Sequence, residues 1–246
     1  LKHILLTIAY DGTNYNGWQR QNNGIGIQEK IEEACYKIFR QDLKVIGASR
    51  TDTGVHALGQ RSLITVDTSI PVDRIPYALN SVLPDDIVIR DAKEVPENFH
   101  PRYSAIKKTY HYHILNEKFP MPQYRNISTF ISSGLDIYAM NEAAQYFVGT
   151  HDFAAFCSAG SSVKTTVRTI YEAFVQKEAP FITFKVTGNG FLYNMVRIMA
   201  GTLIEVGIGK KKPSDIKEII LSKNRNLAGK TAPPQGLTLV DIDYED

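Results

Sequence analysis

The chain has 246 residues, of which 43% are hydrophobic and 22% charged, which is ordinary for a globular protein with one large domain or two small ones. The opening segment turns polar too soon for a signal peptide, and no run of about 18 apolar residues is present, so we expect a cytoplasmic protein with no membrane partner. The net charge of +2 neither requires nor excludes nucleic acid, because phosphate affinity depends on where cations cluster.

In the first hundred residues, hydrophobic periodicity predicts alternating strands and helices. The elements are a strand from His3 to Tyr10, a helix with apolar positions from Ile27 to Phe39, a strand from Ser62 to Asp67, a helix from Val72 to Val82 and a strand from Ile87 to Val95. Such a series is typical of a sheet with helices on one face, of the split βαβ type.

The pattern begins again after about residue 104, so we expect two domains, 1–104 and 105–246. The second domain should hold a strand from Lys108 to Leu115, a helix from Ile137 to Val148 capped by Asp136, a hairpin of 169–175 and 181–187, a buried helix from Asn194 to Val206, a helix from Ser214 to Ser222 capped by Ser214, and a last strand from Leu237 to Tyr244. Cys35 and Cys157 are far apart and lack partners at metal-ligand spacing, which argues against a disulfide framework or a zinc site.

The most informative segment is GASRTDTGVHALGQ, from Gly47 to Gln60. Asp52 is at its centre, two residues after Arg50 and two before Gly54. A turn of this kind lets the backbone approach a ligand while a cation keeps the carboxylate ionised. The alternative is an ordinary surface turn with an incidental charge pair. The whole string favours an active-site loop with Asp52 as nucleophile or base.

The string from Arg50 to Gln60 closely resembles the signature loop of the tRNA pseudouridine synthase A (TruA) family. Similar segments follow in order from Tyr10 to Tyr244, so the resemblance covers essentially the whole chain. It implies an α+β fold of two ferredoxin-like (split βαβ) domains, with mainly antiparallel sheets meeting at a central cleft. It also implies a homodimer that isomerises uridine at positions 38 to 40 of the tRNA anticodon stem-loop without a cofactor, with Asp52 as the catalytic residue.

Tyr110 follows Lys107 and Lys108 at the start of a predicted strand. By the resemblance it matches the family's active-site tyrosine, whose ring could stack on the extruded uracil and whose hydroxyl could relay a proton. The alternative is a half-buried strand aromatic, since tyrosine is common in sheets. We expect the two lysines to bind the substrate.

Arg197 is a lone charge in an apolar helix, and a buried arginine requires an anion. The resemblance favours Asp52 as its partner, and a structural ion pair with Glu205 is the alternative. Arg197 is therefore the third expected catalytic residue, which leaves Arg50 for the target base.

The remaining expected substrate-binding residues are Thr51 and His56 of the loop, and Leu237, whose segment resembles the family's closing loop beneath the uracil. His151-Asp152 lacks a second histidine or a cysteine cluster at suitable spacing, so no metal is expected.

The rival interpretation is a non-catalytic RNA-binding protein with two ferredoxin-like domains, which needs cations and aromatics but no buried aspartate–arginine pair. Both interpretations require phosphate contacts from a clustered subset of the basic residues, for which the candidates are Arg20, Lys107, Lys108, Lys164, Arg168 and Lys210 to Lys212.

Overall fold

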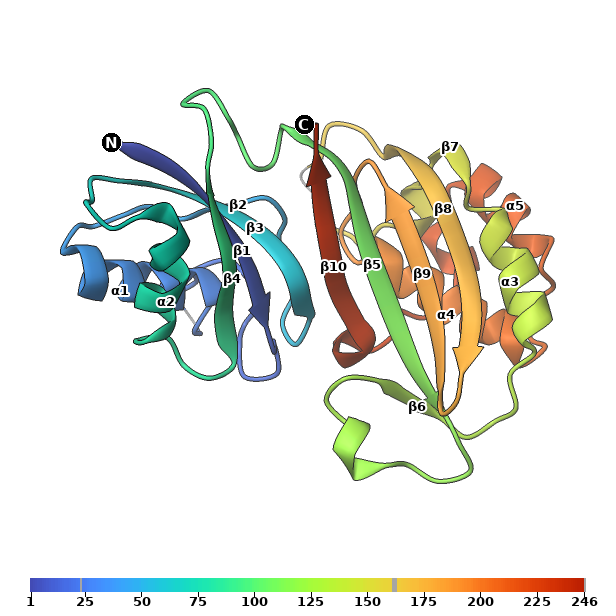
Figure 1. Cartoon of the computed structure of the whole chain (residues 1–246). Coiled ribbons are helices and arrows are strands. Elements are labelled where there is room, and N and C mark those ends of the chain that lie inside the picture. The colour runs from blue at the N-terminus through green and yellow to red at the C-terminus, as the bar shows by residue number, and fades with distance from the viewer. Residues whose placement is uncertain (23, 161–162, 246) are drawn as a thin grey trace. The chain divides into compact units, whose positions relative to one another are not determined.

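The computed structural model describes residues 1–22, 24–160 and 163–245 and divides into two compact units (Figure 1). Unit 1 comprises Leu1–Ile106 with Leu239–Asp246, and unit 2 comprises Lys107–Thr238. Each unit holds a mainly antiparallel sheet with helices, which confirms the predicted α+β class.

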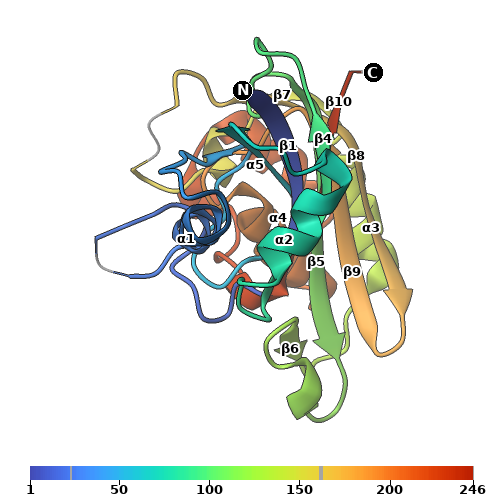
Figure 2. The same ribbon diagram turned by 60° about the vertical axis from the view of Figure 1, so that its left-hand side comes forward.

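Within its described residues, unit 1 contains two α-helices and a sheet whose strand order is β4-β1-β3-β10, with β2 pairing to β3. Strand β1 is antiparallel to both β3 and β4. Helices α1 and α2 contact each other and lie on one face of this sheet (Figures 1 and 2). The bounds are β1 Lys2–Tyr10, α1 Ile27–Phe39, β2 Ile46–Gly47, β3 His56–Val66, α2 Ile75–Asn80, β4 Ile87–Glu94 and β10 Leu237–Tyr244.

Helix α1 has the predicted apolar face. Its buried residues recur at three- and four-residue spacing: Ile27, Ile31, Ala34, Cys35 and Phe39. The helix ends at Arg40, which adopts a left-handed conformation with φ of 56°.

Two predicted elements of unit 1 differ from the structure. The helix expected from Val72 to Val82 is a 3₁₀ turn, Val72–Arg74, followed by the short α2, because Pro76 has no N–H to donate and fits only the first turn of an α-helix. Strand β3 begins at His56, well before the expected Ser62, so the second half of the signature loop is itself a strand.

The C-terminal strand is fixed to unit 1 by two side-chain interactions. Arg61 on β3 forms an ion pair with Asp241, with Nη2 2.9 Å from Oδ1. The Tyr244 hydroxyl donates to the carbonyl oxygen of Pro101 at 2.9 Å. From Leu239 on, the last strand is thus part of the first unit although it follows the second along the chain.

Unit 2 contains three α-helices and a sheet with strand order β5-β9-β8-β7, in which successive neighbours are antiparallel. Strand β6 joins the end of β5 in parallel. Helix α3 packs on β8 and on α4. The bounds are β5 Ala105–Asn116, β6 Thr129–Ile131, α3 Ile137–Gln145, β7 Gly149–Asp152, β8 Val167–Glu178, β9 Phe181–Gly188, α4 Met195–Gly207 and α5 Asp215–Ser222.

Helix α4 is buried over most of its length, as its nearly all-apolar sequence predicts. The predicted cap of α3 is confirmed, since the Asp136 carboxylate accepts from the backbone N–H of Ala139 at 3.0 Å. The predicted cap of α5 is wrong. Ser214 adopts helical dihedrals and makes no capping bond, while the Asp215 carboxylate accepts from the backbone N–H of Lys212 at 2.8 Å.

No helix in the described residues combines the length and apolar character needed to cross a lipid bilayer.

Candidate active site

Asp52 lies in the segment of unit 1 that joins β2 to β3, and its side chain is half-buried. Its carbonyl oxygen accepts from the N–H of Val55 at 3.1 Å, which closes a tight turn. Gly54 within that turn has a φ of +77°, a conformation that side-chain-bearing residues rarely adopt. The turn therefore fixes the backbone that carries the carboxylate.

Thr51 and His56, on either side of Asp52, are buried and use their polar groups inside unit 1. The Thr51 hydroxyl bonds with the Tyr10 hydroxyl at 2.7 Å. His56 Nδ1 accepts from the backbone N–H of Gly12 at 3.1 Å and lies 3.2 Å from a carboxylate oxygen of Asp11. Both side chains thereby tie the loop to the end of β1.

The Asp11 carboxylate is held ionised at this junction. Burial alone would raise its pKa, but hydrogen bonds from the Thr13 hydroxyl and backbone N–H, with the nearby His56 ring, bring the pKa below its ordinary value. The end of β1 is therefore a stable acceptor against which the loop that carries Asp52 is anchored.

Arg50 is exposed, and within the described part of the chain its guanidinium forms no ion pair. The fixed loop thus exposes this cation to solvent.

In unit 2, Tyr110 and Tyr112 are buried on the same face of β5. The Tyr110 ring meets Phe191 edge-on, with 5.1 Å between ring centroids and an interplanar angle of 80°. Lys107 is exposed and Lys108 is half-buried at the start of the same strand. The contact with Phe191 therefore holds the Tyr110 ring in place, and two lysines precede this tyrosine along the chain.

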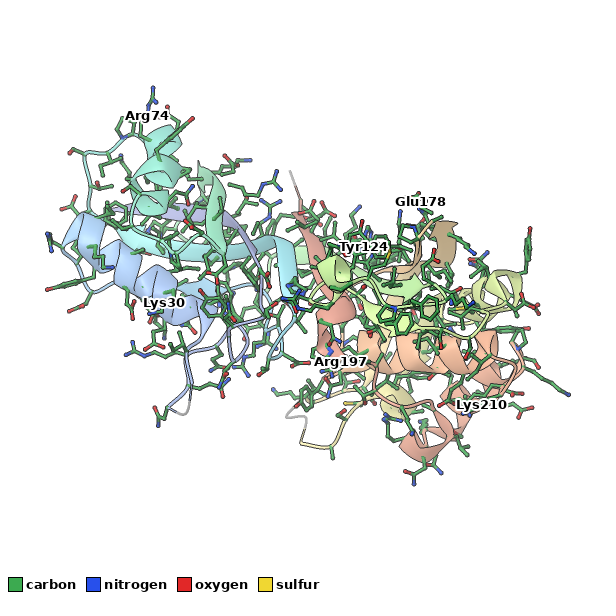
Figure 3. All side chains as sticks on the ribbon, turned by 90° about the horizontal axis from the view of Figure 1, so that it is seen from below. Lys30, Arg74, Tyr124, Glu178, Arg197 and Lys210 are labelled. Carbon is green, nitrogen blue, oxygen red and sulfur yellow. The ribbon has the colours of Figure 1, made fainter. Side chains whose placement is uncertain are left out.

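Arg197 projects from the first turn of α4 and is half-buried (Figure 3). Its Nε donates to the carbonyl oxygen of Ala232 and its Nη1 donates to Oδ1 of Asn194, both at 2.8 Å. The alternative partner, Glu205, forms its ion pair with Lys211 at 3.4 Å. Two neutral oxygens thus orient the Arg197 guanidinium.

The segment from Ala228 to Leu237 packs along α4. The backbone N–H of Ala232 donates to the Arg197 carbonyl at 3.0 Å, which completes a reciprocal pair with the Arg197 side chain. The N–H of Gly229 donates to the Thr202 hydroxyl at 2.9 Å. Leu237, the expected closing-loop leucine, is buried at the end of this segment.

Tyr112 connects β5 to the same segment, because its hydroxyl donates to the carbonyl oxygen of Pro233 at 2.8 Å. Burial raises the pKa of Tyr112 to about 12, against smaller opposing effects of the Thr129 hydroxyl and the Arg197 charge. Tyr112 therefore stays a hydrogen-bond donor at neutral pH.

Sequence analysis missed Asn194. Its backbone has a φ of +60°, its Oδ1 accepts from Arg197, and its Nδ2 donates to the Ser158 hydroxyl at 3.0 Å. An asparagine just before an apolar helix was the available signal, because asparagine tolerates the left-handed conformation better than most residues.

We expect Gly201→Ala to disturb this arrangement. A Cβ at position 201 would lie 1.8 Å from the carbonyl oxygen of Lys230, so α4 and the segment must separate. The free energy of unfolding, measured by urea denaturation, should fall by about 1 to 3 kcal/mol. Gly134→Ala is the control, because nothing lies within 4 Å of a Cβ built there. Equal stability of the two variants would contradict the tight packing.

No group of three or more histidine, cysteine, aspartate or glutamate side chains that could hold a metal ion occurs in the described residues.

A sequence model of the family described as tRNA pseudouridine synthase matches residues 6–104 and 143–245. This chain is 51% identical to the protein named tRNA pseudouridine synthase A of Thermoanaerobacter sp. (strain X514), 50% identical to that of Acetivibrio thermocellus and 52% identical to that of Caldicellulosiruptor bescii. Each match covers 99% of this chain and 100% of the relative.

Among solved structures, a chain in a crystal structure of a Cbf5-Nop10-Gar1 complex aligns with 97% of this chain and 59% of its own length. At 14% identity and a TM-score of 0.36, this similarity is too distant to bear on function. With half of its residues shared with these relatives over nearly its full length, the chain belongs to the tRNA pseudouridine synthase family.

Proposed function

We propose that this tRNA pseudouridine synthase isomerises uridine at positions 38 to 40 of the anticodon stem-loop, with Asp52 as nucleophile or base and with no cofactor. The observation that carries the proposal is the family match across nearly the whole chain, combined with a half-buried carboxylate on a fixed turn. The positions in tRNA rest on the resemblance of the signature loop.

The reaction breaks the bond between ribose C1′ and uracil N1, turns the base over and joins C1′ to C5. The proton on C5 leaves, and N1 gains a proton, so the reaction is an isomerisation with no net change of atoms. A carboxylate can add to C6 of uracil, attack C1′ or begin an elimination from the sugar, and each route requires Asp52 to be ionised.

Arg197 and Tyr110 supply the other two catalytic roles in this proposal. The Arg197 guanidinium, oriented by neutral acceptors, would stabilise the Asp52 carboxylate against desolvation when the base is bound. The Tyr110 ring would stack on the extruded uracil, and its hydroxyl would carry the proton removed from C5. Asp52 belongs to unit 1 and the other two residues to unit 2, so the proposal requires both units to act on one nucleotide.

Substrate binding would use the surrounding polar and apolar groups. Arg50 would act when the target base is displaced, Leu237 would pack beneath the uracil, and Lys107 and Lys108 would contact phosphates. Thr51 and His56 would contribute by holding the loop in place, because their polar groups are engaged within unit 1.

We also propose that the protein acts as a homodimer. Exposed apolar side chains on the segment around β6, namely Phe119, Met121, Ile127 and Phe130, support association with a second copy. Sedimentation equilibrium should give twice the 27.6 kDa chain mass, and a monomer at micromolar concentration would contradict the proposal.

Transcripts that differ only at the target sites test the proposed tRNA positions. An anticodon stem-loop with uridine at 38, 39 and 40 should gain pseudouridine at those sites, whereas replacing all three by cytidine should abolish product. Retained pseudouridine in the cytidine transcript would place the target elsewhere in the tRNA. Binding without product in either transcript would favour a non-catalytic RNA-binding protein.

A further inference from the structure

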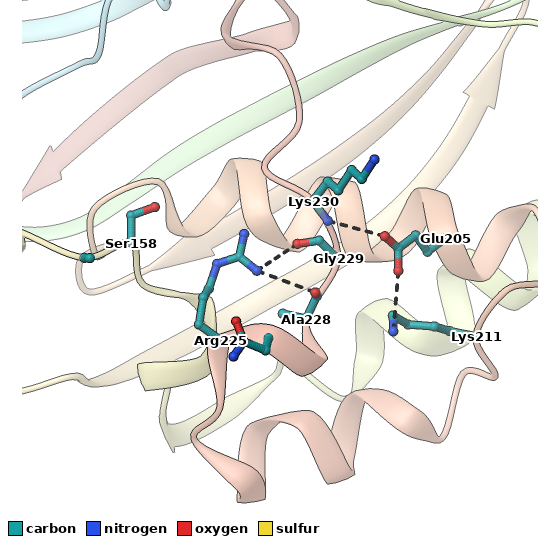
Figure 4. A pocket seen from close by; sticks show the side chains of 9 residues that line it. Ser158, Glu205, Lys211, Arg225, Ala228, Gly229 and Lys230 are labelled. Atoms are coloured by element: carbon teal, nitrogen blue, oxygen red, sulfur yellow. Dashed lines mark hydrogen bonds and ion pairs between the residues drawn. The ribbon is translucent and has the colours of Figure 1, made fainter.

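Unit 2 contains a pocket of about 520 Å³ beside α4 (Figure 4). Its walls come from the segment before β8, from the end of α4 and the turn after it, and from the segment that follows α5. The lining residues are Ser158, Ala159, Glu205, Lys211, Arg225, Asn226, Ala228, Gly229 and Lys230. The volume lies in the range of small-ligand sites.

The pocket carries an excess of positive charge. Its three cations are Lys211, Arg225 and Lys230, and its one carboxylate belongs to Glu205. Glu205 is already engaged, since it pairs with Lys211 at 3.4 Å and accepts from the backbone N–H of Lys230 at 3.3 Å. Two cations therefore remain to attract an anion.

The Arg225 guanidinium is held in the pocket wall by hydrogen bonds and keeps further N–H donors. Its Nη1 donates to the carbonyl oxygen of Gly229 at 2.9 Å and approaches that of Ala228 at 3.5 Å, and its Nη2 donates to the Thr231 hydroxyl at 3.1 Å. A guanidinium has five N–H donors, so Nε–H and one Nη2–H are unused among the described residues. All its partners are neutral, so the positive charge is not cancelled.

The remaining lining groups suit a phosphate better than a base. The pocket has no aromatic or large apolar side chain on which a base could stack. The Ser158 hydroxyl accepts from Asn194 and keeps its own proton available for an oxygen ligand. A fork of arginine N–H groups, an ammonium and a hydroxyl match the oxygens of a phosphodiester.

Two chains of contacts connect the pocket to Arg197, one through Ser158 and one through the segment after Arg225. On one side, Ser158 bonds to Asn194, which bonds to Arg197. On the other, the segment held by Arg225 continues to Ala232, which accepts from Arg197. Glu205 on the pocket wall follows Arg197 by eight residues, or about 12 Å along α4.

We infer that this pocket binds a phosphodiester of the tRNA backbone, and that its walls transmit this contact to Arg197. The inference rests on the proposed function, because it needs tRNA as the ligand. If the pocket binds a phosphodiester, Ser158, Arg225 and Lys230 join the residues expected to contact phosphate. Of the three lysines Lys210 to Lys212, Lys211 is the one that lines the pocket.

Lys230→Ala is the most direct test, because the Lys230 side chain is exposed and forms no hydrogen bond or ion pair among the described residues. Affinity for a tRNA transcript, measured by fluorescence anisotropy, should fall by roughly fivefold, and the slope of log K against log salt should become shallower by about 0.7 to 0.9. Lys230→Glu should weaken binding further. Arg225 is a poorer probe, since its loss would also release the Ala228–Thr231 segment.

Lys217→Ala is the matched control. It removes the same charge from an exposed lysine of unit 2 that does not line the pocket, and it should leave both the affinity and the salt slope unchanged. If Lys230→Ala equals wild type in both quantities while wild type forms pseudouridine in the same tRNA, the pocket assignment is wrong and the proposed function stands. If wild type neither binds nor modifies tRNA, both the proposed function and the pocket assignment are wrong.

Inorganic phosphate distinguishes a tRNA phosphate from a free one. Thermal stabilisation of wild type by phosphate that is lost in Lys230→Ala, with no change in tRNA affinity, would assign the pocket to a free anion and overturn the inference. A parallel loss of tRNA affinity supports the backbone phosphodiester.

Discussion

Asp52→Asn is expected to fold, to bind tRNA as wild type does and to lose pseudouridine formation by roughly 10⁴-fold or more. Asparagine has nearly the same size as aspartate, so the turn closed by Val55 should persist. Its amide cannot serve as an anionic nucleophile or base at neutral pH, which removes every proposed route to cleavage of the bond between C1′ and N1. Pseudouridine per tRNA, measured by nucleoside chromatography, gives the loss.

The control for this prediction is Asp42→Asn, which neutralises an exposed carboxylate of unit 1 outside the loop and should keep full activity. Turnover by Asp52→Asn within tenfold of wild type would show that the carboxylate is not the reacting group. A loss of tRNA binding in the variant would instead assign Asp52 to substrate binding.

Tyr110→Phe should have the second largest effect, lowering the single-turnover rate by roughly 10² to 10⁴-fold, the usual range for loss of a general acid or base. The phenyl ring keeps the edge-on contact with Phe191, so the fold and the stacking surface remain. Tritium retained at C5 of the labelled base, with unchanged tRNA affinity, would locate the defect in proton transfer.

Tyr171→Phe is the matched control, because it removes a hydroxyl from a half-exposed tyrosine on β8. A rate for Tyr110→Phe equal to that of this control would reduce Tyr110 to a stacking platform. An alanine at position 110 would then still be expected to impair binding of the flipped base.

The sequence was most informative where local pattern decides the structure. The apolar spacing from Ile27 to Phe39 gave the bounds of α1, and Asp136 caps α3 as a residue of its type before a helix should. Ser214 failed as a cap because its backbone already adopts helical dihedrals, which residue type alone does not reveal. The early start of β3 was hidden because the segment from His56 to Gln60 alternates poorly and includes Gly59.

The contacts that shape the candidate site are mostly long-range and could not be read from local pattern. The bond from Tyr112 to Pro233 joins residues 121 positions apart, and the bond from Asn194 to Ser158 spans 36. Arg197 was recognised as a charge in need of acceptors, and within unit 2 its guanidinium donates to an asparagine side chain and a backbone carbonyl that local pattern did not indicate. Residue chemistry thus proposes the functional groups, and the fold shows which neighbours orient them.

The most direct measurement is single-turnover release of tritium from uridine labelled at C5 in tRNA, comparing wild type with Asp52→Asn at matched tRNA occupancy. Isomerisation expels the C5 hydrogen, so wild type should release tritium in one turnover while the variant, equally loaded with tRNA, retains it. Release by the variant at the wild-type rate would contradict the catalytic role of Asp52, and absence of release from both despite binding would contradict the proposed reaction on that tRNA.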